Sequence, residues 1–573
     1  MKNKKNYLFL GLLVSLVLLS YLPSLFSGFV SDDINAIVES ESLLKHASYI
    51  IANPKFIVRS ALFYFAYQLG GVNPAFFRSI NIIFHIGVVI LAYLIIPHFS
   101  KKRYLAFFVA ALTAVHPVMI ESVTWISGGI YTQAAFFLLL SLFLYIKNRE
   151  QLISKSFWQP AVSAGRPESD PGQARLAEAT AKRARMTISR LILSLIFYIL
   201  ALSSSEKTIV FPAILILYEY CFFSLNKNWK KIVPFALISI FWIFLLIPFI
   251  SPRLEYFKTT RGAGLEPMNP FFAIPQAIGA YLQLFIWPQN LSHYHYDIIF
   301  SFGNIVLNFI LFLCFLGGLV FSFIKNRLLF FFLSFFIIGL GITLNSLGFS
   351  WLVAERYVYL PSIGLYFIVG YAFSVLISKK HFNLFGWIVF SIIIVSLFLR
   401  TVIRNKDWQN SETLWLATAK ASPNYVASQN NAANIYVLNG EYENAIEAYK
   451  KAIELNPNYS YSYYNLGYTL RLMKRHHEAI PVLKKAISLN PTYWQSYEQL
   501  GGIYFELGDF DRSEVYVRKA IALAPKQSML YAQLGTLLLK KEDLVGAKTA
   551  FEKALEIDPQ NEVAKEELGK IFL

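Results

Sequence analysis

The first four hundred residues are a succession of long apolar runs separated by short polar gaps. Eleven runs can be drawn, at 7–26, 76–97, 104–116, 130–146, 190–203, 208–224, 232–250, 305–323, 328–346, 362–378 and 384–400. A helix needs roughly 20 mainly apolar residues to cross a bilayer, so the shorter runs must include flanking residues. The chain is only 15% charged, whereas soluble domains carry about 25% charged residues. This excludes a purely soluble enzyme, a disordered chain and a fibre, and predicts about 11 membrane spans.

The net charge of +17 lies in this apolar part of the chain. Residues 406–573 carry 19 basic and 20 acidic residues, so residues 1–405 hold 33 basic and 15 acidic ones. The basic residues gather in alternate gaps, namely Lys2–Lys5, Lys101–Arg103, Lys147–Arg190, Lys227–Lys231, Lys325–Arg327 and Lys379–Lys380. Cytoplasmic loops of membrane proteins are rich in Lys and Arg. The excess positive charge is therefore explained by membrane topology and does not indicate a nucleic acid partner. The alternation predicts a cytoplasmic N-terminus and an extracytoplasmic segment after residue 400.

Three segments need a separate interpretation. Residues 7–26 resemble a signal peptide but have a long apolar run and no small-residue cleavage site, which favours an uncleaved anchor. Residues 271–288 are apolar enough to cross, but one more crossing would reverse the charge asymmetry downstream. We therefore expect an interfacial or re-entrant helix there. Residues 158–186 are rich in Ala, Arg, Pro and Gly, unlike their surroundings, and we interpret them as a cytoplasmic loop or insertion with room for a short helix.

The last third of the chain repeats with a constant period. Prolines recur every 34 residues, at positions 423, 457, 491, 525 and 559. Small residues recur at two other positions of each period, namely Ala433, Gly467, Gly501, Gly535 and Ala452, Ala486, Ala520, Ala554. In tetratricopeptide repeats such residues let paired helices approach closely, and proline ends the second helix. The period thus predicts a tetratricopeptide α-solenoid.

The predicted fold is all-α, with a polytopic membrane helix bundle at 1–403 and a repeat domain at 404–573. The repeat domain divides into a half-repeat at 411–423, full repeats at 426–459, 460–493, 494–527 and 528–561, and a terminal helix at 562–573. Stacked repeats form a superhelix whose concave face binds an extended peptide or a partner helix. Repeats that only space or dimerise the chain remain an alternative.

Two adjacent carboxylates, Asp32 and Asp33, follow the first apolar run directly. Carboxylates near the hydrocarbon boundary are costly, so their presence suggests a function. One can act as a base toward an acceptor hydroxyl while the other orients it or holds a cation. Alternatively, the pair marks the exit from the membrane and caps the next helix.

Each later gap on the same predicted face also supplies polar side chains. These are His116 and Glu121 in the second gap, Glu206 and Lys207 in the third, and Glu355, Arg356 and Tyr357 in the fifth. A guanidinium grips two phosphate oxygens at once, so Arg356 is suited to a lipid phosphate. Alternatively, Glu355 and Arg356 form a local ion pair and His116 is a satisfied interfacial histidine. Convergence on one face favours a site.

His293, His295 and Asp297 form a further polar group in the same part of the chain. Two histidines and a carboxylate can bind a metal. Because no further ligand can be assigned, we interpret them as residues of the aromatic membrane interface. A divalent cation such as Mg or Mn stays open, and no other cofactor is expected.

The order of these motifs resembles the TMTC family, the transmembrane and tetratricopeptide-repeat-containing O-mannosyltransferases, and its prokaryotic relatives. The matching stretches are Phe29–Asp33, His116–Glu121 with Gly128, Glu206–Pro212, Trp287-Pro288 with Leu291-Ser292, Ala354–Ser362, and Arg404-Asn405 with Asp407-Trp408. Two features depart from the family pattern. Gly129 and Tyr131 stand where many relatives have charged residues, and Ser205 stands where a lysine often precedes the glutamate.

The resemblance implies a membrane glycosyltransferase of the GT-C fold that uses a sugar on a polyprenyl phosphate. It implies Asp32 as the base, Asp33 as its support or an acceptor contact, and direct displacement with inversion at the sugar. Arg356 would bind the donor phosphate with Glu355. His116, Glu121, Glu206, Lys207 and Tyr357 would shape the site. The acceptor would be a Ser or Thr hydroxyl of a protein or peptide in the tetratricopeptide groove.

Two other functions compete with this one. A non-catalytic membrane scaffold would use its repeats to recruit envelope proteins. A transporter is less favoured, because transport sites lie near the bilayer midplane whereas these polar residues lie at one face. Residue usage rich in Lys, Asn, Ile and Phe favours a multi-pass protein of a prokaryotic inner membrane. In a eukaryote the same topology implies the endoplasmic reticulum membrane.

Overall fold

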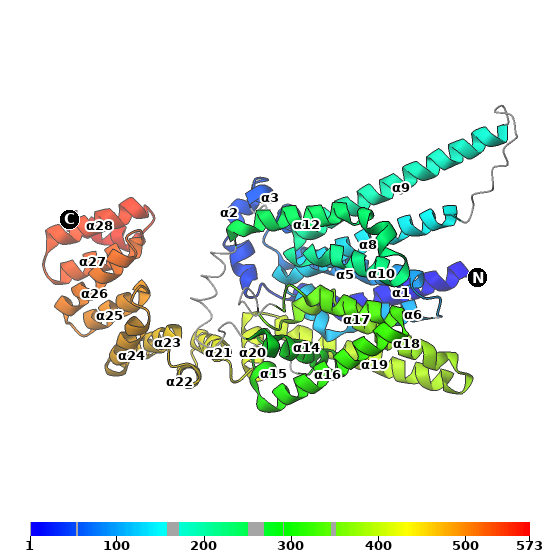
Figure 1. The fold of residues 1–573 in the computed structure, drawn as a ribbon. Helices are drawn as coiled ribbons and strands as arrows, with labels where there is room; N and C mark the ends of the chain where they lie inside the picture. The colour runs from blue at the N-terminus through cyan, green and yellow to red at the C-terminus, as the bar shows by residue number, and fades with distance from the viewer. Residues whose placement is uncertain are drawn as a thin grey trace. The chain divides into compact units, whose positions relative to one another are not determined.

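In the computed structural model, residues 2–52, 56–102, 104–156, 171–249, 269–289, 291–344 and 351–572 are described. Every regular element within these ranges is a helix, which confirms the predicted all-α fold. The chain divides into two compact units (Figure 1). The first unit includes residues up to Ala417, with Trp408 and Leu414 in its core, and the second extends from Thr418 to Leu573. The domain boundary expected at 403–404 remains a prediction.

Within the described residues, all eleven apolar runs overlap helices of the first unit. These are α1 (Lys2–Tyr21), α5 (Pro74–Ile95), α6 (Leu105–Val115), α8 (Ile130–Ser156), α9 (Pro171–Ser204), α10 (Phe211–Phe222), α12 (Val233–Leu246), α16 (Phe302–Lys325), α17 (Arg327–Leu340), α18 (Ser362–Ser378) and α19 (Asn383–Asn405). Among the described residues, five helices are long and apolar enough to cross a membrane, or up to six if one bent pair is a single span. Five further apolar helices are shorter. The first unit is thus a bundle of apolar helices, as expected of a membrane protein.

Shorter elements connect these helices. They are α2 (Glu41–Leu44), α3 (Tyr49–Ala52), α4 (Ile57–Gly70), α7 (Ile120–Val123), α11 (Leu225–Asn228), α14 (Pro270–Ile286), α15 (Asp297–Phe300) and, among single turns, η2 (Ile34–Val38), η6 (Ser127–Gly129), η7 (Glu206–Val210) and η10 (Glu355–Val358). The candidate site residues lie mostly in these connections, where the backbone is not committed to a long helix.

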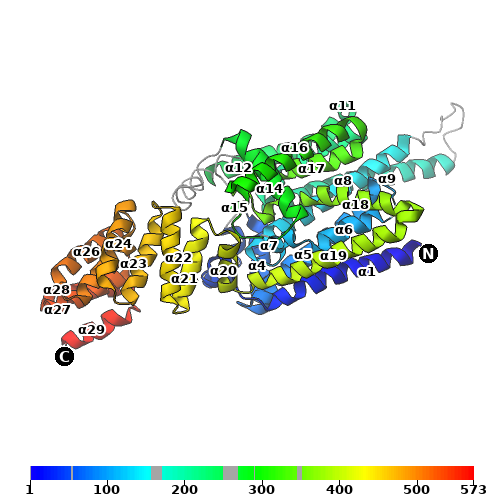
Figure 2. The same ribbon diagram turned by 90° about the horizontal axis from the view of Figure 1, so that it is seen from below.

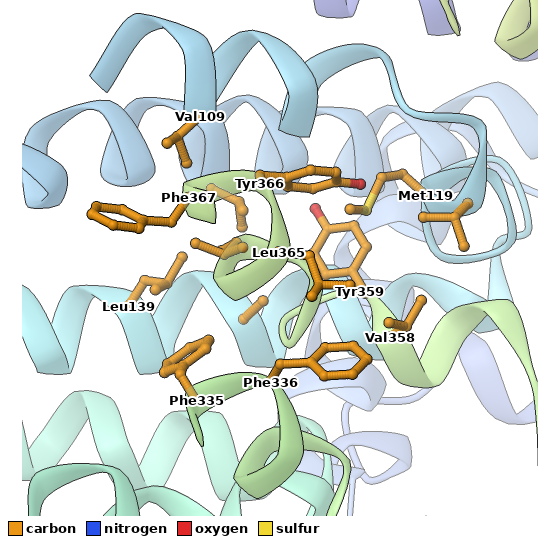
Figure 3. Close-up of a cluster of buried hydrophobic side chains, with 14 of the residues drawn as sticks. Val109, Met119, Leu139, Phe335, Phe336, Val358, Tyr359, Leu365, Tyr366 and Phe367 are labelled. Carbon is orange, nitrogen blue, oxygen red and sulfur yellow. The ribbon is translucent and has the colours of Figure 1, made fainter. Parts of the chain in front are cut away.

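The core of the first unit is built by close packing between α5, α6, α8, α17 and α18, which neighbour one another in Figure 2. Phe332 of α17 and Phe367 of α18 stack with their ring centroids 3.6 Å apart. Figure 3 shows Phe367 beside Val109 and Leu139, which come from α6 and α8. In lipid, apolar helices gain little from the hydrophobic effect when they associate, so such van der Waals contacts and buried polar contacts hold the bundle together.

Two of the segments that the sequence set apart, 158–186 and 271–288, are at least partly described in the structure. Residues 158–170 lie outside the described residues, whereas 171–186 belong to the long helix α9. Most of the segment 271–288 belongs to α14, which ends at Ile286 and packs closely on α16 because Gly279 has no side chain where the Asn308 backbone approaches. Asn308 also accepts a hydrogen bond from Gln283 at 2.8 Å. Whether α14 crosses the bilayer remains a prediction.

The second unit consists of paired helices stacked in chain order (Figures 1 and 2). The helices are α21 (Val426–Leu438), α22 (Tyr442–Leu455), α23 (Ser460–Leu472), α24 (His476–Leu489), α25 (Trp494–Glu506), α26 (Phe510–Leu523), α27 (Ser528–Lys540), α28 (Leu544–Ile557) and α29 (Glu562–Phe572). A further helix, α20 (Ser411–Ala421), precedes them. Each predicted full repeat contains one helix pair. The small residues of the period lie at the helix contacts, where Ala433, Ala452 and Ala486 are buried.

Gly467 provides a test of this close approach. A Cβ added there would lie 2.5 Å from Cγ of the buried Leu483 on the paired helix. We expect Gly467→Ala to destabilise the repeats by about 1–3 kcal/mol, because overpacked contacts force shifts. Gly569→Ala is the matched control: nothing lies within 4 Å of its added Cβ, and Ala favours helix by up to about 1 kcal/mol. Hydrogen exchange of peptides from 460–489 in the full chain should rise only for Gly467→Ala.

Candidate active site

The two aspartates after α1 have different surroundings. Asp33 is fully buried, and its Oδ1 accepts hydrogen bonds from the Ser127 backbone N–H at 2.8 Å and the Ser127 hydroxyl at 2.6 Å. Its Oδ2 accepts a longer one, at 3.4 Å, from Val30 N–H. Asp32, by contrast, is exposed. Of the two carboxylates, only Asp32 is accessible to a second molecule.

The backbone around the pair is irregular on both sides. Ser31 has φ of 52°, in the left-handed region that non-glycine residues rarely adopt. On the other side the chain forms a π-helical turn, Ile34–Val38, a geometry found often at functional sites. A strained residue costs of order 1–3 kcal/mol and persists only where its surroundings impose it. Within this irregular backbone, Asp33 is buried and its neighbour Asp32 is exposed.

Burial raises the pKa of Asp33 to about 6, although the Ser127 hydrogen bonds and the Arg78 charge oppose the shift. Because the folded-state pKa exceeds the ordinary value of 3.8, the folded protein holds this proton more tightly than the unfolded chain. The associated stability is therefore present below pH 4 and is lost as the pH rises through 6. This difference in pKa between the folded and the unfolded chain corresponds to about 3 kcal/mol of folding stability at low pH.

Asp33→Asn should remove this pH dependence, since the amide is neutral at every pH. We expect the melting temperature of the variant relative to wild type to rise between pH 4.5 and pH 7.5. Thermal unfolding of the full chain in detergent at several pH values measures the difference. A constant difference across this range would contradict the assignment.

Arg78, on α5, anchors the first loop to the second and was not identified from the sequence. Its Nε donates to the Thr124 carbonyl at 2.7 Å. Its Nη1 and Nη2 donate to the carbonyls of Ser27 and Gly28 at 2.7 and 2.9 Å. A basic residue inside an apolar run, four residues after Pro74, was the one available signal. Together with the Asp33–Ser127 contact, it holds the two loops in one arrangement.

The second and fifth gaps meet in a buried ion pair between Glu121 and Arg356. The guanidinium contacts Glu121 Oε1, and the backbone N–H of Arg356 donates to Oε2 at 2.8 Å. His293 Nδ1 lies 3.3 Å from the same carboxylate. The partner of Arg356 is therefore Glu121 from another gap, and the local ion pair with Glu355 considered as an alternative does not form among the described contacts.

Glu355 belongs to a second buried group. Its Oε1 accepts from the Ser292 N–H at 2.9 Å and lies 3.2 Å from His295 Nε2. Arg404 Nη2 lies 3.5 Å away, and Arg404 also binds Asp407 at 2.7 Å. His293 and His295 thus serve two different carboxylates. The histidine pair links the fourth gap to the site, a connection that the sequence did not reveal.

His116 is held on both sides of its ring. Its Nε2 lies 3.0 Å from the Phe285 carbonyl, and its Nδ1 accepts from Val118 N–H at 3.3 Å. The ring also stacks on the Phe285 ring, with centroids 5.3 Å apart. With both nitrogens engaged, His116 joins the second loop to α14 and contributes no open ligand.

The third gap contacts the site where Lys207 lies over the ring of Tyr357. Lys207 Nζ lies 4.8 Å from the centre of the Tyr357 ring, and the Arg356 guanidinium lies 5.1 Å from it. Tyr131 is 6.0 Å from Tyr357, ring to ring, and is within electrostatic reach of Glu206 and Glu121. Lys207 and Glu206 are half-buried. The five predicted gaps therefore include three that meet around Tyr131 and Tyr357.

A second basic residue missed by the sequence reasoning, Arg59 on α4, lies near Asp32. Burial lowers the pKa of Arg59, while the charges of Tyr49 and Asp32 oppose this shift. Its guanidinium lies 4.8 Å from the Phe56 ring centre, and its buried Nε has no hydrogen-bond partner in the described part of the chain. A cation thus accompanies the exposed aspartate.

The divalent cation considered from the sequence remains a prediction. Among the described residues, no group of three or more His, Cys, Asp or Glu is arranged to hold an ion. The buried carboxylates Asp33, Glu121 and Glu355 already accept hydrogen bonds from protein donors. Asp32 is left as a carboxylate that can accept a proton from a bound molecule. The arrangement suits general-base chemistry beside cations.

The repeats of the second unit match known families. Residues 433–474 match the TPR repeat, residues 460–493 match the tetratricopeptide repeat, and residues 495–527 and 530–561 match a further tetratricopeptide repeat family. A crystal structure of MamA is 29% identical and covers 27% of this chain and 88% of its own, with a TM-score of 0.24.

About three quarters of the chain also matches longer relatives. The protein O-mannosyl-transferase TMTC3 of Mus musculus is 23% identical over 496 residues, covering 75% of this chain and 49% of its own length. The Homo sapiens TMTC3 is 24% identical over 491 residues, covering 74% and 48%. The chain is homologous to the TMTC3 O-mannosyl-transferases. It spans about half the length of the TMTC3 proteins it matches. The resemblance inferred from the motifs is confirmed.

Proposed function

We propose that this chain is a membrane glycosyltransferase of the GT-C type. It transfers a sugar from a polyprenyl-phosphate donor to a protein hydroxyl at the extracytoplasmic face. The observation that carries the proposal is the contrast between an exposed Asp32 and a buried, anchored Asp33 at the edge of the apolar bundle. Homology to TMTC3 supports glycosyl transfer. The apolar helices would place the enzyme in the bilayer, where a polyprenyl donor resides.

Asp32 acts as the general base in the proposed reaction. It takes the proton of a Ser or Thr hydroxyl as that oxygen attacks the anomeric carbon of the sugar. The bond between the anomeric carbon and the phosphate oxygen breaks, and polyprenyl phosphate leaves with the electron pair. A single displacement of this kind inverts the configuration at the sugar. General-base assistance contributes about 10²–10⁴-fold to such a step.

Asp33 is a positioning residue in this reaction. Its hydrogen bonds to Ser127 tie the aspartate loop to the second loop, so Asp32 is presented from a fixed backbone. Buried polar contacts join the remaining loops, and they are made by Glu121, Arg356, Glu355 and His295. A fixed base lowers the entropy cost of reaching the reactive geometry.

The tetratricopeptide repeats bind the acceptor in this proposal. Repeats of this kind present concave surfaces to extended chains, and TMTC3 proteins are named protein O-mannosyl-transferases. A segment held there brings Ser and Thr hydroxyls to an enzyme that is confined to the membrane. Mannose is the first sugar to test for the same reason.

The test is sugar transfer by the purified full-length protein in lipid vesicles. Radiolabelled polyprenyl-phosphate mannose and polyprenyl-phosphate glucose are offered with a mixture of Ser- and Thr-containing peptides, and a nucleotide sugar serves as the donor control. We expect label in peptide from a polyprenyl-phosphate donor alone. Folded protein that transfers neither sugar would contradict the proposal and support a scaffold that recruits envelope proteins.

A further inference from the structure

We propose that Lys207, and not Arg356, contacts the phosphate of the donor. This inference rests on the proposed function but concerns a separate question, namely which cation meets the lipid phosphate. The sequence favoured Arg356 for its guanidinium geometry. The contacts of the two side chains favour Lys207.

Arg356 already has an anionic partner. Its guanidinium and its backbone N–H both bind the carboxylate of Glu121, which is fully buried. The Arg356 side chain is 9% exposed. A phosphate reaching this guanidinium would have to displace a buried carboxylate or share the cation with it. Separating a buried ion pair is strongly unfavourable.

Lys207, unlike Arg356, has no carboxylate partner among the described residues. Within the described residues no carboxylate lies within ion-pair distance of its Nζ, and the ammonium instead lies 4.8 Å from the centre of the Tyr357 ring. The residue is half-buried, so its charge is partly removed from water without a counter-ion from the described part of the chain. A cation on an aromatic face retains donors for an anion. A phosphate oxygen supplies that anion.

Lys207 also lies in a suitable place relative to the aspartates. Ser127 binds Asp33, and Tyr131, four residues later, contacts the ring of Tyr357 on which Lys207 lies. The loop that carries the aspartates and the proposed phosphate ligand are therefore both connected to the short segment from Ser127 to Tyr131.

The lipid side of the donor has a route to this position. Lys207 follows α9 directly, and the outward face of α9 carries exposed isoleucines before it reaches η7. These are Ile188, Ile192, Ile196 and Ile199. Their spacing of three to four residues makes one continuous apolar stripe. A polyprenyl chain lying along this stripe ends with its phosphate near Lys207.

Binding of polyprenyl monophosphate to the full-length protein in detergent tests the proposal, with polyprenol as the uncharged probe. Loss of one charge-assisted hydrogen bond costs about 1.5–3 kcal/mol, so Lys207→Ala should raise the Kd for the phosphate about 10-fold or more. The Kd for polyprenol should not change. Lys207→Arg should retain most of the affinity.

Lys102→Ala is the matched control, because Lys102 Nζ lies 4.9 Å from the centre of the Tyr371 ring, a similar geometry outside the site. It should bind both probes like wild type. Unchanged phosphate affinity in Lys207→Ala, or equal losses for both probes, would overturn the proposal. If Lys207 governs phosphate affinity while no sugar is transferred, the proposed function fails and this inference stands.

Discussion

Asp32→Asn is expected to lower sugar transfer by about 10²–10⁴-fold while the protein inserts and folds normally. The expected loss is the usual contribution of a general base. Folding should be preserved because Asp32 is exposed and its replacement is isosteric. The measurement is the initial rate of label transfer at saturating donor, together with the melting temperature of the same preparation.

The effect should fall on the chemical step and not on binding. We therefore expect kcat to fall while the KM for the donor changes little, since Asp32 contacts the acceptor hydroxyl in the proposed reaction. Glu39→Gln is the control, because Glu39 is another exposed acid in the same loop and should retain full activity. Full activity in Asp32→Asn would remove the base assignment, whatever the outcome for the lipid phosphate.

The helical framework could be predicted from the sequence because each helix is determined by local pattern. The prolines at a 34-residue period and the glycine at 467 describe contacts between helices adjacent in the chain. The apolar runs likewise predict helices one at a time. Neither pattern depends on knowing which distant segments meet, so the sequence alone predicted an all-α fold with tetratricopeptide repeats.

The partners of the site residues could not be predicted in this way. Glu355 and Arg356 are adjacent in sequence, yet Arg356 binds Glu121, 235 positions away. His293 and His295 resembled a metal motif, but they contact two different carboxylates, Glu121 and Glu355. Such pairings are set by how the loops cross over the bundle, and a single sequence carries no pattern for that.

Two basic residues of the site, Arg78 and Arg59, were missed for a related reason. Arg78 lies within an apolar run and binds only backbone carbonyls, so no acidic partner in the sequence indicated it. Arg59 likewise lies near the exposed Asp32 in the folded chain, although the two residues are far apart in the sequence. Both would have been identifiable only as isolated charges among apolar residues, which are rare at membrane depth and are seldom without a partner.

Breaking the Glu121–Arg356 pair should have the largest effect on stability. Glu121→Gln leaves the buried guanidinium without its counter-ion, and Arg356→Met leaves the buried carboxylate with His293 alone. Removing one partner of a buried ion pair costs about 3–5 kcal/mol. We expect each single variant to lower the melting temperature strongly in detergent.

The double variant measures how strongly the two side chains of the pair interact with each other. Glu121→Gln combined with Arg356→Met buries no net charge, so it should be less destabilised than the sum of the single variants by at least about 1 kcal/mol. Lys45→Gln is the control, because Lys45 pairs with Glu41 at 3.5 Å where both side chains are largely exposed, and such pairs contribute about 0–1 kcal/mol. If the losses in the double variant simply add, the two side chains are not coupled, and the buried pair does not join the second and fifth loops.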